Sequence, residues 1–321
     1  MLLSVVVPVY GCRTCLGTLH ERLSATLAQV TPAYEIVFVD DGTQDGTWPA
    51  LRALAHADRA VRAIRLSRNF GQQAAIVAGL EHAAGRHVAV MDCDLQDPPE
   101  VLPTMYGRAI EGFPIVYGAR MRHGTPAFRR AAAWCYAKLL NATTHAGIDP
   151  RHGCFSLMSR EVVDAYLRIP DRDRNHTMIL YWLGFPSATV TYEQPARHSG
   201  SSAYTIRSLV RLAGDSLFFH TTALLRWVVY LGFAVALCGL GLAIYYTAVR
   251  VTSGAVPAGF TALAVLILVM TGFTITSVGV TGLYVGRVFE QVKGRPLYVV
   301  AEETDLQTDA QREAARERPS G

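Results

Sequence analysis

The chain has 321 residues, of which 50% are hydrophobic and only 17% are charged. With a positive mean hydropathy, this composition is too apolar for a purely soluble protein and predicts that part of the chain lies in lipid. The net charge of +4 is too small to favour a nucleic-acid-binding protein.

Six cysteines are scattered along the chain without the paired spacing of a disulfide-rich secreted domain. A reducing cytosol fits this cysteine usage better. Cys12 and Cys15 form the one suggestive pair, but a zinc or redox site would need further residues at matching spacing. The N-terminal apolar run has no basic leader and reaches Pro8 too soon for a signal peptide, so we expect a buried strand there.

The N-terminal part alternates short apolar runs with stretches of helical spacing. Four apolar, largely β-branched runs are predicted to be strands: residues 3–7, 35–39, 61–66 and 87–91. Helical spacing covers the stretches between them: residues 16–28, 48–57 and 73–84. Strand and helix in alternation predict an α/β fold with a mainly parallel sheet.

Polar motifs follow the four predicted strands, at residues 9–11, 40–43, 67–71 and 92–99. In parallel α/β sheets, ligands bind beyond the carboxyl ends of the strands. We therefore expect the four motifs to meet at one ligand site.

The motif MDCDLQDPPE, residues 91–100, directly follows the fourth predicted strand. Asp92 and Asp94 share one face of an extended strand, so their carboxylates can converge on one hard cation, Mg²⁺ or Mn²⁺. Such an ion can bridge a diphosphate and offset the charge of a departing nucleoside diphosphate. Two aspartates alone would also fit an acidic helix start before Pro98 and Pro99.

Two further strand ends carry groups suited to a nucleotide-sugar. Asp40 and Asp41 precede a turn that contains glycine, where a carboxylate can accept hydrogen bonds from ribose hydroxyls or a base N–H. Arg68 and Asn69 precede Gly71 at the opening of a predicted helix, a position suited to anionic groups. For Asp40 and Asp41, the alternative is an acidic turn that is exposed to solvent and binds no ligand.

The later part of the chain predicts a transmembrane hairpin. Residues 227–249 and 260–285 carry no charge, and each stretch exceeds the ~20 residues that cross ~30 Å of hydrocarbon. Basic residues gather outside the hairpin, with one in its loop: Arg207, Arg211 and Arg226 before it, Arg250 within it, and Arg287, Lys293 and Arg295 after it. This bias places both outer ends, and so both termini, in the cytosol.

The predicted organisation therefore has four parts. Residues 1–200 form a cytoplasmic catalytic domain, and residues 227–286 form the membrane hairpin. Residues 201–226, with arginines at helical spacing, are predicted to be an amphipathic helix on the membrane surface, although an ordinary surface helix fits the same periodicity. Residues 287–321 return to the cytosol and, from about Glu302, form a charged tail that we expect to be disordered.

The chain resembles the polyisoprenyl-phosphate branch of inverting family 2 glycosyltransferases in five ordered motifs: VVVPVYG, VDDGT, LSRNFGQQAAIVAGL, MDCDLQDPPE and GAR. That branch includes dolichol-phosphate mannose synthase and bacterial enzymes that load glucose or aminoarabinose onto undecaprenyl phosphate. The resemblance continues to GLYVGRVFEQVKGRPLYVV and covers about residues 1–300. It implies a GT-A nucleotide-sugar-binding domain.

The resemblance also implies a donor site. The residues implied to line its nucleotide pocket are Pro8, Tyr10 and Asp41. Those implied to bind the metal and the diphosphate are Asp92, Asp94 and Gln96. Arg197 matches an arginine that closes over the diphosphate.

For the acceptor, the resemblance implies that Arg120 and Arg129 meet a lipid phosphate. Arginine suits this task because its planar fork pairs with two phosphate oxygens at once. Five positions depart from the family pattern and bear on the sugar preference and phosphate contacts: Gly11, Ala133, Cys154, Ser156 and Ala203.

Together these features predict an inverting enzyme that moves one sugar from a UDP- or GDP-linked donor to a polyprenyl phosphate at the inner membrane. Base catalysis is hardly needed, because a phosphate monoester with a second pKa of ~6 is mostly ionised at neutral pH; Asp97 is the reserve base. The alternatives are a processive polysaccharide synthase and a non-catalytic scaffold or flippase component. A homo-oligomer is compatible with the resemblance and the hairpin.

Overall fold

The computed structural model describes residues 1–121, 149–172, 174–193, 228–235 and 259–304, with isolated positions between 237 and 252. The chain divides into two compact units. One contains Met1–Ala203 and Pro296–Gly321, and the other contains Tyr204–Arg295.

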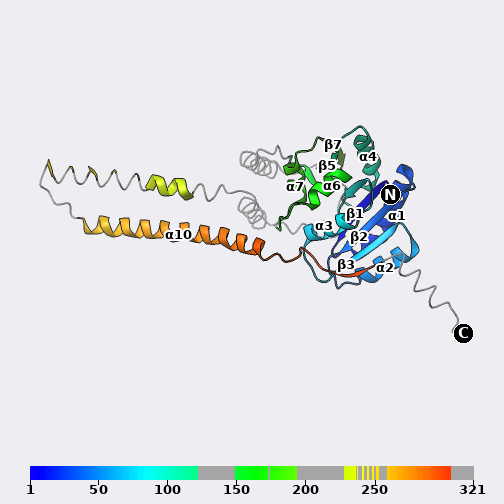
Figure 1. The fold of residues 1–321 in the computed structure, drawn as a ribbon, viewed down its shortest axis with the longest axis horizontal. Helices are drawn as coiled ribbons and strands as arrows, with labels where there is room; N and C mark the ends of the chain where they lie inside the picture. Colours follow the sequence, from blue (N-terminus) through cyan, green and yellow to red (C-terminus); the bar gives the residue numbers. More distant parts are fainter. Residues whose placement is uncertain are drawn as a thin grey trace. The chain divides into compact units, whose positions relative to one another are not determined.

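The first unit is built on one eight-stranded sheet with the order β7-β5-β6-β4-β1-β2-β3-β8 (Figure 1). Its strands are β1 (Leu3–Val9), β2 (Tyr34–Asp40), β3 (Val61–Leu66), β4 (His87–Val90), β5 (Ile115–Met121), β6 (His152–Ser159), β7 (Ser187–Glu193) and β8 (Val300–Glu303). Strands β1 to β4 are mutually parallel, β5 pairs parallel with β7, and β6 and β8 run antiparallel to their neighbours. The predicted α/β class and mainly parallel sheet are therefore confirmed.

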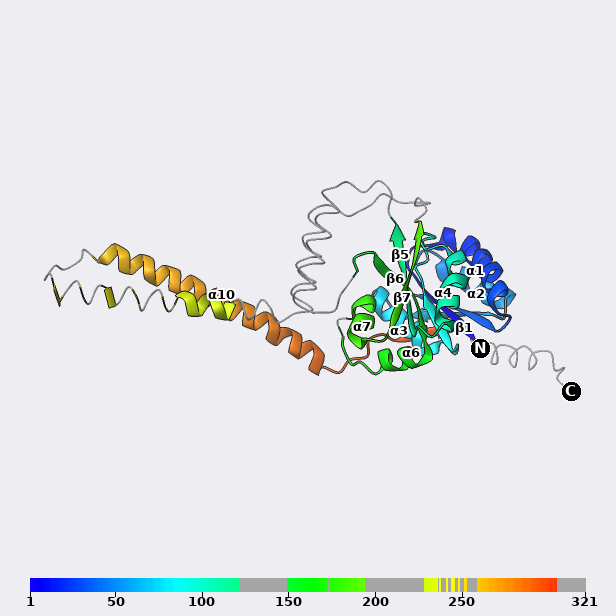
Figure 2. The ribbon, with the colours of Figure 1, turned by 90° about the horizontal axis from the view of Figure 1, so that it is seen from above.

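Helices cover both faces of the sheet (Figure 2). One face carries η1 (Arg13–Cys15), α1 (Leu16–Val30), α2 (Thr47–Ala57), η2 (Pro99–Val101) and α4 (Leu102–Ile110). The other face carries α3 (Gln72–His82), α6 (Arg160–Leu167) and α7 (His176–Leu183). Side chains of β1 alternate between the two cores, with Val5 and Val7 in the first and Val6 in the second. The carboxyl ends of the parallel strands stay free of this packing and can form a site.

The predicted elements of the N-terminal part agree with β1 to β4 and α1 to α3 to within two residues at each end. Helix α3 is buried over most of its length because it packs closely on the sheet. At Gly79 a Cβ atom would overlap the side chain of Val6, so only glycine permits this approach. The close packing fixes the start of α3 beside the strand ends.

The end of the described chain corrects one prediction. Residues from about Glu302 were expected to be disordered, but Val300–Glu303 form β8 on the edge of β3. The charges that indicated a solvated tail have partners in the sheet: Arg65 donates to Glu302 at 3.0 Å and Arg62 donates to Glu303 at 2.7 Å. Local composition misjudged this segment because its partners lie far away in the sequence.

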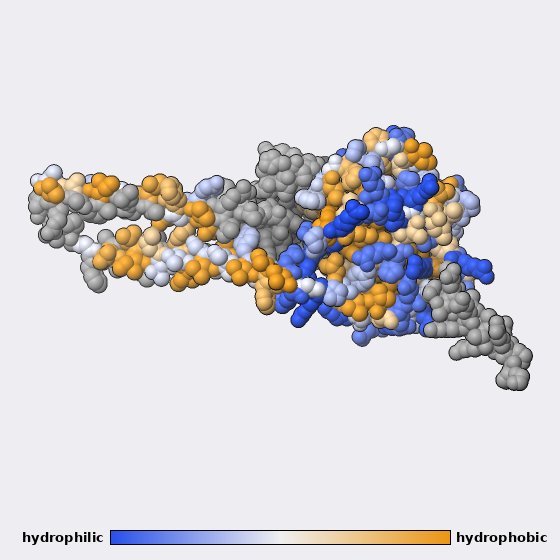
Figure 3. All heavy atoms as spheres, in the orientation of Figure 1, coloured by the Kyte–Doolittle hydropathy of each residue, from blue (hydrophilic) through white to orange (hydrophobic). Residues whose placement is uncertain are grey.

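The second unit contains α10 (Phe260–Val292), which includes the second predicted span. Apolar atoms are exposed along this helix (Figure 3). Ile275 and Val278 are among its exposed apolar side chains. Gly232 lies against α10, because a Cβ atom there would come within 2.9 Å of the Phe273 ring. Considering the described residues alone, no helix combines the length and apolar character needed to cross a membrane. The hairpin stays a prediction.

Several predictions lie outside the described residues. They are the amphipathic helix at 201–226, much of the first span at 227–249 and the tail from residue 305. Four predicted or noted positions do so as well: Arg129, Ala133, Arg197 and Ala203.

Candidate active site

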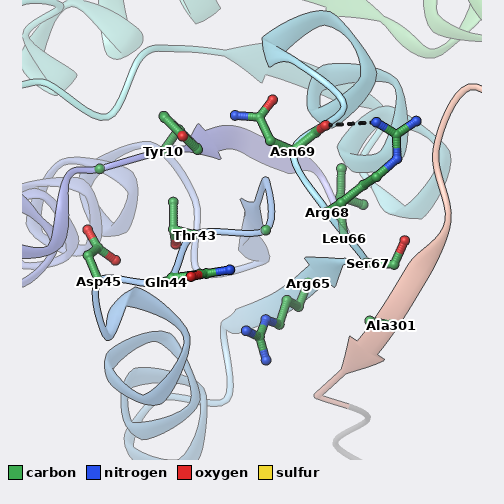
Figure 4. A pocket seen from close by; sticks show the side chains of 12 residues that line it. Tyr10, Thr43, Gln44, Asp45, Arg65, Leu66, Ser67, Arg68, Asn69 and Ala301 are labelled. Atoms are coloured by element: carbon green, nitrogen blue, oxygen red, sulfur yellow. Dashed lines mark hydrogen bonds between the residues drawn. The ribbon is translucent and has the colours of Figure 1, made fainter.

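A cavity of about 820 Å³ opens at the carboxyl ends of β1, β2 and β3 (Figure 4). Its lining comes from the end of β3, from the segments after these strands and from β8: Tyr10, Gly11, Gly42, Thr43, Gln44, Asp45, Arg65, Leu66, Ser67, Arg68, Asn69 and Ala301. A second cavity of about 170 Å³ shares Tyr10 and Gly11 with the first and extends to Asp94 and Gln96. The two cavities thus bring together all four polar motifs.

Arg68 and Tyr10 lie where the sequence placed them, at the larger cavity. Tyr10 is 61% exposed at its rim. The guanidinium of Arg68 lies over the Phe70 ring, 4.3 Å from its centroid, and donates to the carbonyl of Asn69 at 3.5 Å (Figure 4). Both side chains can therefore contact a ligand in the cavity.

Asp41 supports the cavity from behind instead of lining it. Its two carboxylate oxygens accept hydrogen bonds from the amides of Phe70 and Gly71, at 2.7 and 2.9 Å. The side chain is buried, and burial raises its pKa although both hydrogen bonds oppose the shift. The structure therefore corrects the implied role of Asp41 as a pocket-lining residue, and Pro8 likewise is buried within β1. The amide partners of Asp41 come from another loop, which the sequence pattern did not indicate, and its direct contact with a nucleotide stays a prediction.

Asp40 is also occupied inside the protein. Its Oδ1 accepts hydrogen bonds from the amide and the hydroxyl of Thr43, at 3.0 and 2.5 Å. Its Oδ2 faces Nε of Arg65 at 3.6 Å. Burial raises the pKa of Asp40, against the Thr43 hydrogen bonds and the Arg65 charge. Asp40 thus shapes the turn that lines the cavity, and its contact with a donor stays a prediction.

Asp92 begins a cluster of charged groups beside the smaller cavity. Its side chain is 25% exposed and accepts hydrogen bonds from Gln72 at 2.6 Å and from Nη2 of Arg120 at 3.2 Å. Burial, followed by the charge of Asp97, raises the pKa of Asp92 to about 6. Arg120 opposes this shift. An aspartate with this pKa exchanges its proton near physiological pH, as functional carboxylates often do.

Asp97 holds Arg120 in a two-point pair. Nε and Nη2 of Arg120 each donate to a carboxylate oxygen of Asp97 at 3.1 Å, while the Asp97 side chain is fully buried. The hydroxyl of Tyr192, on β7, donates to the same carboxylate. Burial lowers the pKa of Arg120, but the charge of Asp97, the Tyr192 hydroxyl and the charge of Asp92 together outweigh it, so the pKa is raised. Arg120 is therefore a fixed cation at the end of β5.

Residues 4–167 match the family model described as glycosyl transferase family 2. The chain belongs to this family. It is 32% identical over 319 residues to the undecaprenyl-phosphate 4-deoxy-4-formamido-L-arabinose transferase of Yersinia pestis, covering 96% of this chain and 97% of the relative. It is 33% identical over 302 residues to a prophage-derived bactoprenol glucosyl transferase of Shigella flexneri, covering 94% and 97%. The family resemblance of the motifs is confirmed.

Among solved structures, this glycosyltransferase is similar to glucosyl-3-phosphoglycerate synthase of Mycobacterium tuberculosis in complex with Mn²⁺, uridine diphosphate and phosphoglyceric acid. The match has a TM-score of 0.47 and 18% identity, and it covers 68% of this chain and 76% of that chain.

The loop after β4 holds the two carboxylates proposed as metal ligands in this glycosyltransferase. Asp94 accepts a hydrogen bond from the amide of Gln96 at 3.1 Å. Leu95 between them has a φ of 61°, a left-handed conformation that costs a residue with a Cβ atom ~1–2 kcal/mol. Asp92 and Asp94 supply oxygen ligands, the type that Mg²⁺ and Mn²⁺ prefer, and phosphate oxygens commonly complete such sites. Within the described ranges, no group of three or more His, Cys, Asp or Glu side chains is arranged to hold a metal ion.

The sequence did not identify two side chains that hold the glycosyltransferase cluster. Gln72 fixes Asp92, and Tyr192 fixes Asp97. Gln72 stands inside the LSRNFGQQAA motif, so a signal was present but was assigned to the preceding arginine and asparagine. Tyr192 comes from a strand whose local pattern marks no role.

The smaller cavity adds Cys93 to the pair Cys12 and Cys15, a connection that sequence spacing did not indicate. Cys12, Cys15 and Cys93 are buried and free, and all three line this cavity. The Cys12 thiol donates to the carbonyl oxygen of Cys93 at 3.2 Å. This contact ties the loop after β1 to the loop that carries Asp92 and Asp94.

Proposed function

We propose that this enzyme moves one sugar, with inversion, from a nucleotide-sugar to a polyprenyl phosphate. The observation that carries the proposal is the continuity of the site: the larger cavity meets the Asp94 cavity at Tyr10 and Gly11. The two similar relatives support the acceptor, because their names combine different sugars with a polyprenol lipid. The lipid is the shared substrate, and the sugar is the variable one.

The donor would bind across both cavities. A volume of about 820 Å³ suits a nucleoside, and its lining offers hydroxyl, amide and guanidinium groups. The diphosphate would then lie toward Asp94, which lines the smaller cavity. The sugar would face Arg120 and Asp92.

Asp92 and Asp94 would hold Mg²⁺ or Mn²⁺ together with the diphosphate. The bound ion would supply positive charge where the nucleoside diphosphate departs. Gln72 and Arg120 orient the Asp92 carboxylate through its two oxygens. Although burial raises the pKa of Asp92 to about 6, this value is still below neutral pH, so the carboxylate is mostly deprotonated there and can bind the ion.

The acceptor phosphate needs positioning more than deprotonation, since it is mostly ionised at neutral pH. Arg120 supplies a preorganised cation, because its bonds to Asp97 and Tyr192 hold the guanidinium before substrate arrives. These bonds use Nε and Nη2, so a phosphate would share Arg120 with the carboxylates. Asp97, buried and bonded to Arg120, orients this arginine, which leaves it little capacity to act as a base. Arg129 and Arg197 stay predicted phosphate contacts.

We further place the enzyme in the inner membrane, with the catalytic domain and both termini in the cytosol and a hairpin at residues 227–249 and 260–285. The support comes from the uncharged stretches and their basic flanks. Exposed apolar side chains along α10 are what a lipid-facing helix presents. This placement would bring the domain to the level at which a lipid phosphate is presented.

The full-length chain, purified in detergent, tests the proposal. It would be incubated with Mn²⁺, undecaprenyl phosphate and a panel of UDP- and GDP-linked sugars. We expect one lipid product that carries a single sugar, and loss of this product with Asp94→Ala. Undiminished transfer by Asp94→Ala would disprove the metal assignment, and a polymeric product would favour a processive synthase. Arg108→Ala, at an exposed pair with Glu111, is the matched surface control.

A further inference from the structure

The larger cavity has a wall that comes from the far end of the described chain. β8 pairs with β3, and the amide of Ser67 donates to the carbonyl of Val299 at 2.8 Å. Ala301, on β8, lines the cavity (Figure 4). The strand belongs to the first unit although the whole second unit precedes it in the sequence. The cavity is therefore incomplete without residues close to the C-terminus.

Glu302 on this strand bonds two side chains of the catalytic domain. One carboxylate oxygen accepts from Nη1 of Arg65 at 3.0 Å, and the other accepts from Nε1 of Trp48 at 2.9 Å. Arg65 also faces the buried carboxylate of Asp40 at 3.6 Å. Arg65 is thus held between two carboxylates, one at the end of β2 and one on β8. A guanidinium fixed in this way presents a defined set of donors.

Arg65 stands at the end of the site that is far from the metal-binding loop. It lines the larger cavity, whereas Asp94 lines the smaller one. Its side chain is 32% exposed, so it can still reach a ligand. With the diphosphate at Asp94, the group nearest Arg65 is the nucleoside.

We propose that Glu302 is a positioning residue for nucleoside recognition: it holds Arg65 so that the guanidinium donates to an oxygen of the nucleobase or ribose. This inference rests on the proposed function, because it takes a nucleotide as the occupant of the cavity. It makes the C-terminal strand part of the donor site. The contribution of Glu302 should be independent of the metal and of the diphosphate.

The adjacent residue supplies a matched control. Glu303 is on the same strand but pairs with Arg62 at 2.7 Å and lies 3.8 Å from His82, away from the cavity lining. Glu302→Gln and Glu303→Gln each remove one charge from β8 and weaken one arginine pair. Damage to the strand itself should therefore be similar in both variants.

The experiment measures nucleotide binding by calorimetry on the full-length chain in detergent. UMP, UDP, GMP and GDP are titrated with and without Mn²⁺ into wild type and both variants. For the nucleotide that wild type binds, we expect Glu302→Gln to lower the affinity about tenfold, the scale of one hydrogen bond to a charged group. The loss should be equal for monophosphate and diphosphate, with or without Mn²⁺. Glu303→Gln should stay within about twofold, because neither Glu303 nor its partner Arg62 lines the cavity.

A second measurement separates positioning from strand stability. In an Arg65→Met background, Glu302→Gln should have no further effect on affinity, because Arg65, through which Glu302 acts on the ligand, is absent. In transfer assays Glu302→Gln should raise the KM for the donor and leave kcat unchanged. Thermal unfolding of the two glutamine variants should agree within a few degrees.

Three results would overturn the inference: unchanged affinity in Glu302→Gln, a loss seen only with diphosphate and Mn²⁺, or an equal loss in Glu303→Gln. Wild type that binds none of the four nucleotides would instead overturn the proposed function.

Discussion

The two ends of the site use aspartates in opposite ways. At the end with the larger cavity, Asp40 and Asp41 are buried, and their oxygens accept hydrogen bonds from Thr43 and from the amides of Phe70 and Gly71. At the carboxylate end, Asp92 is partly exposed, and its partners are the side chains of Gln72 and Arg120. Asp40 and Asp41 each accept hydrogen bonds from backbone amides of the loops that they shape, whereas the described partners of Asp92 are side chains, which a ligand can replace.

The largest effect expected at the carboxylate end is that of Asp92→Asn. The amide keeps the size of the side chain but loses the negative charge that, in the proposed function, holds the metal ion. We expect transfer to fall by a factor on the order of 1,000, as for other groups that stabilise a transition state. Initial rates at saturating donor measure it. Near-normal rates would show that Asp92 takes no part in sugar transfer. The aspartates at both ends of the site would then have structural roles alone.

Asp41→Asn should act on the fold first. An asparagine presents only one acceptor to the two amides of Phe70 and Gly71, so one donor is left unpaired. We expect a loss of about 1–3 kcal/mol in the free energy of unfolding, measured with denaturant, together with weaker nucleotide binding. A variant of normal stability that fails to bind nucleotide would show instead that Asp41 contacts the nucleotide directly.

Tyr192→Phe should have a smaller effect at the carboxylate end. It removes the hydroxyl that donates to Asp97 while Arg120 keeps its two bonds to that carboxylate. We expect kcat to fall about tenfold, the scale of one hydrogen bond to a charged group, with nucleotide affinity unchanged. A change in affinity with constant kcat would place Tyr192 in donor binding.

The smallest expected effect is a pH dependence of stability in the protein without metal or nucleotide. The folded pKa of Asp92, about 6, lies above the ~3.9 of an unfolded chain, so the folded state binds more protons between these values. The contribution of Asp92 is therefore greatest below pH ~4 and is lost as the pH rises through about 6. The difference in unfolding free energy between wild type and Asp92→Asn should change by on the order of 2 kcal/mol from pH 4 to 7. A flat difference would mean that Arg120 fully compensates the burial of Asp92.

The sequence by itself determined the first half of the sheet. Strands β1 to β4 and helices α1 to α3 were predicted to within two residues, because buried parallel strands leave short continuous apolar runs and helices leave a helical spacing of apolar residues. It also determined the family and the meeting of the polar motifs, since parallel strands must end at one edge of the sheet.

Only the tertiary structure decided what each strand-end residue does. Asp40, Asp41 and Asp92 occupy equivalent places in the pattern, and their different roles follow from partners on other loops. The edge strand β8 is the clearest case, because Trp48 and Glu302 meet across 254 positions of sequence. No local periodicity or composition records a contact over such a distance, so Glu302 and Glu303, taken for the start of a tail, belong to an edge strand whose Ala301 lines the larger cavity.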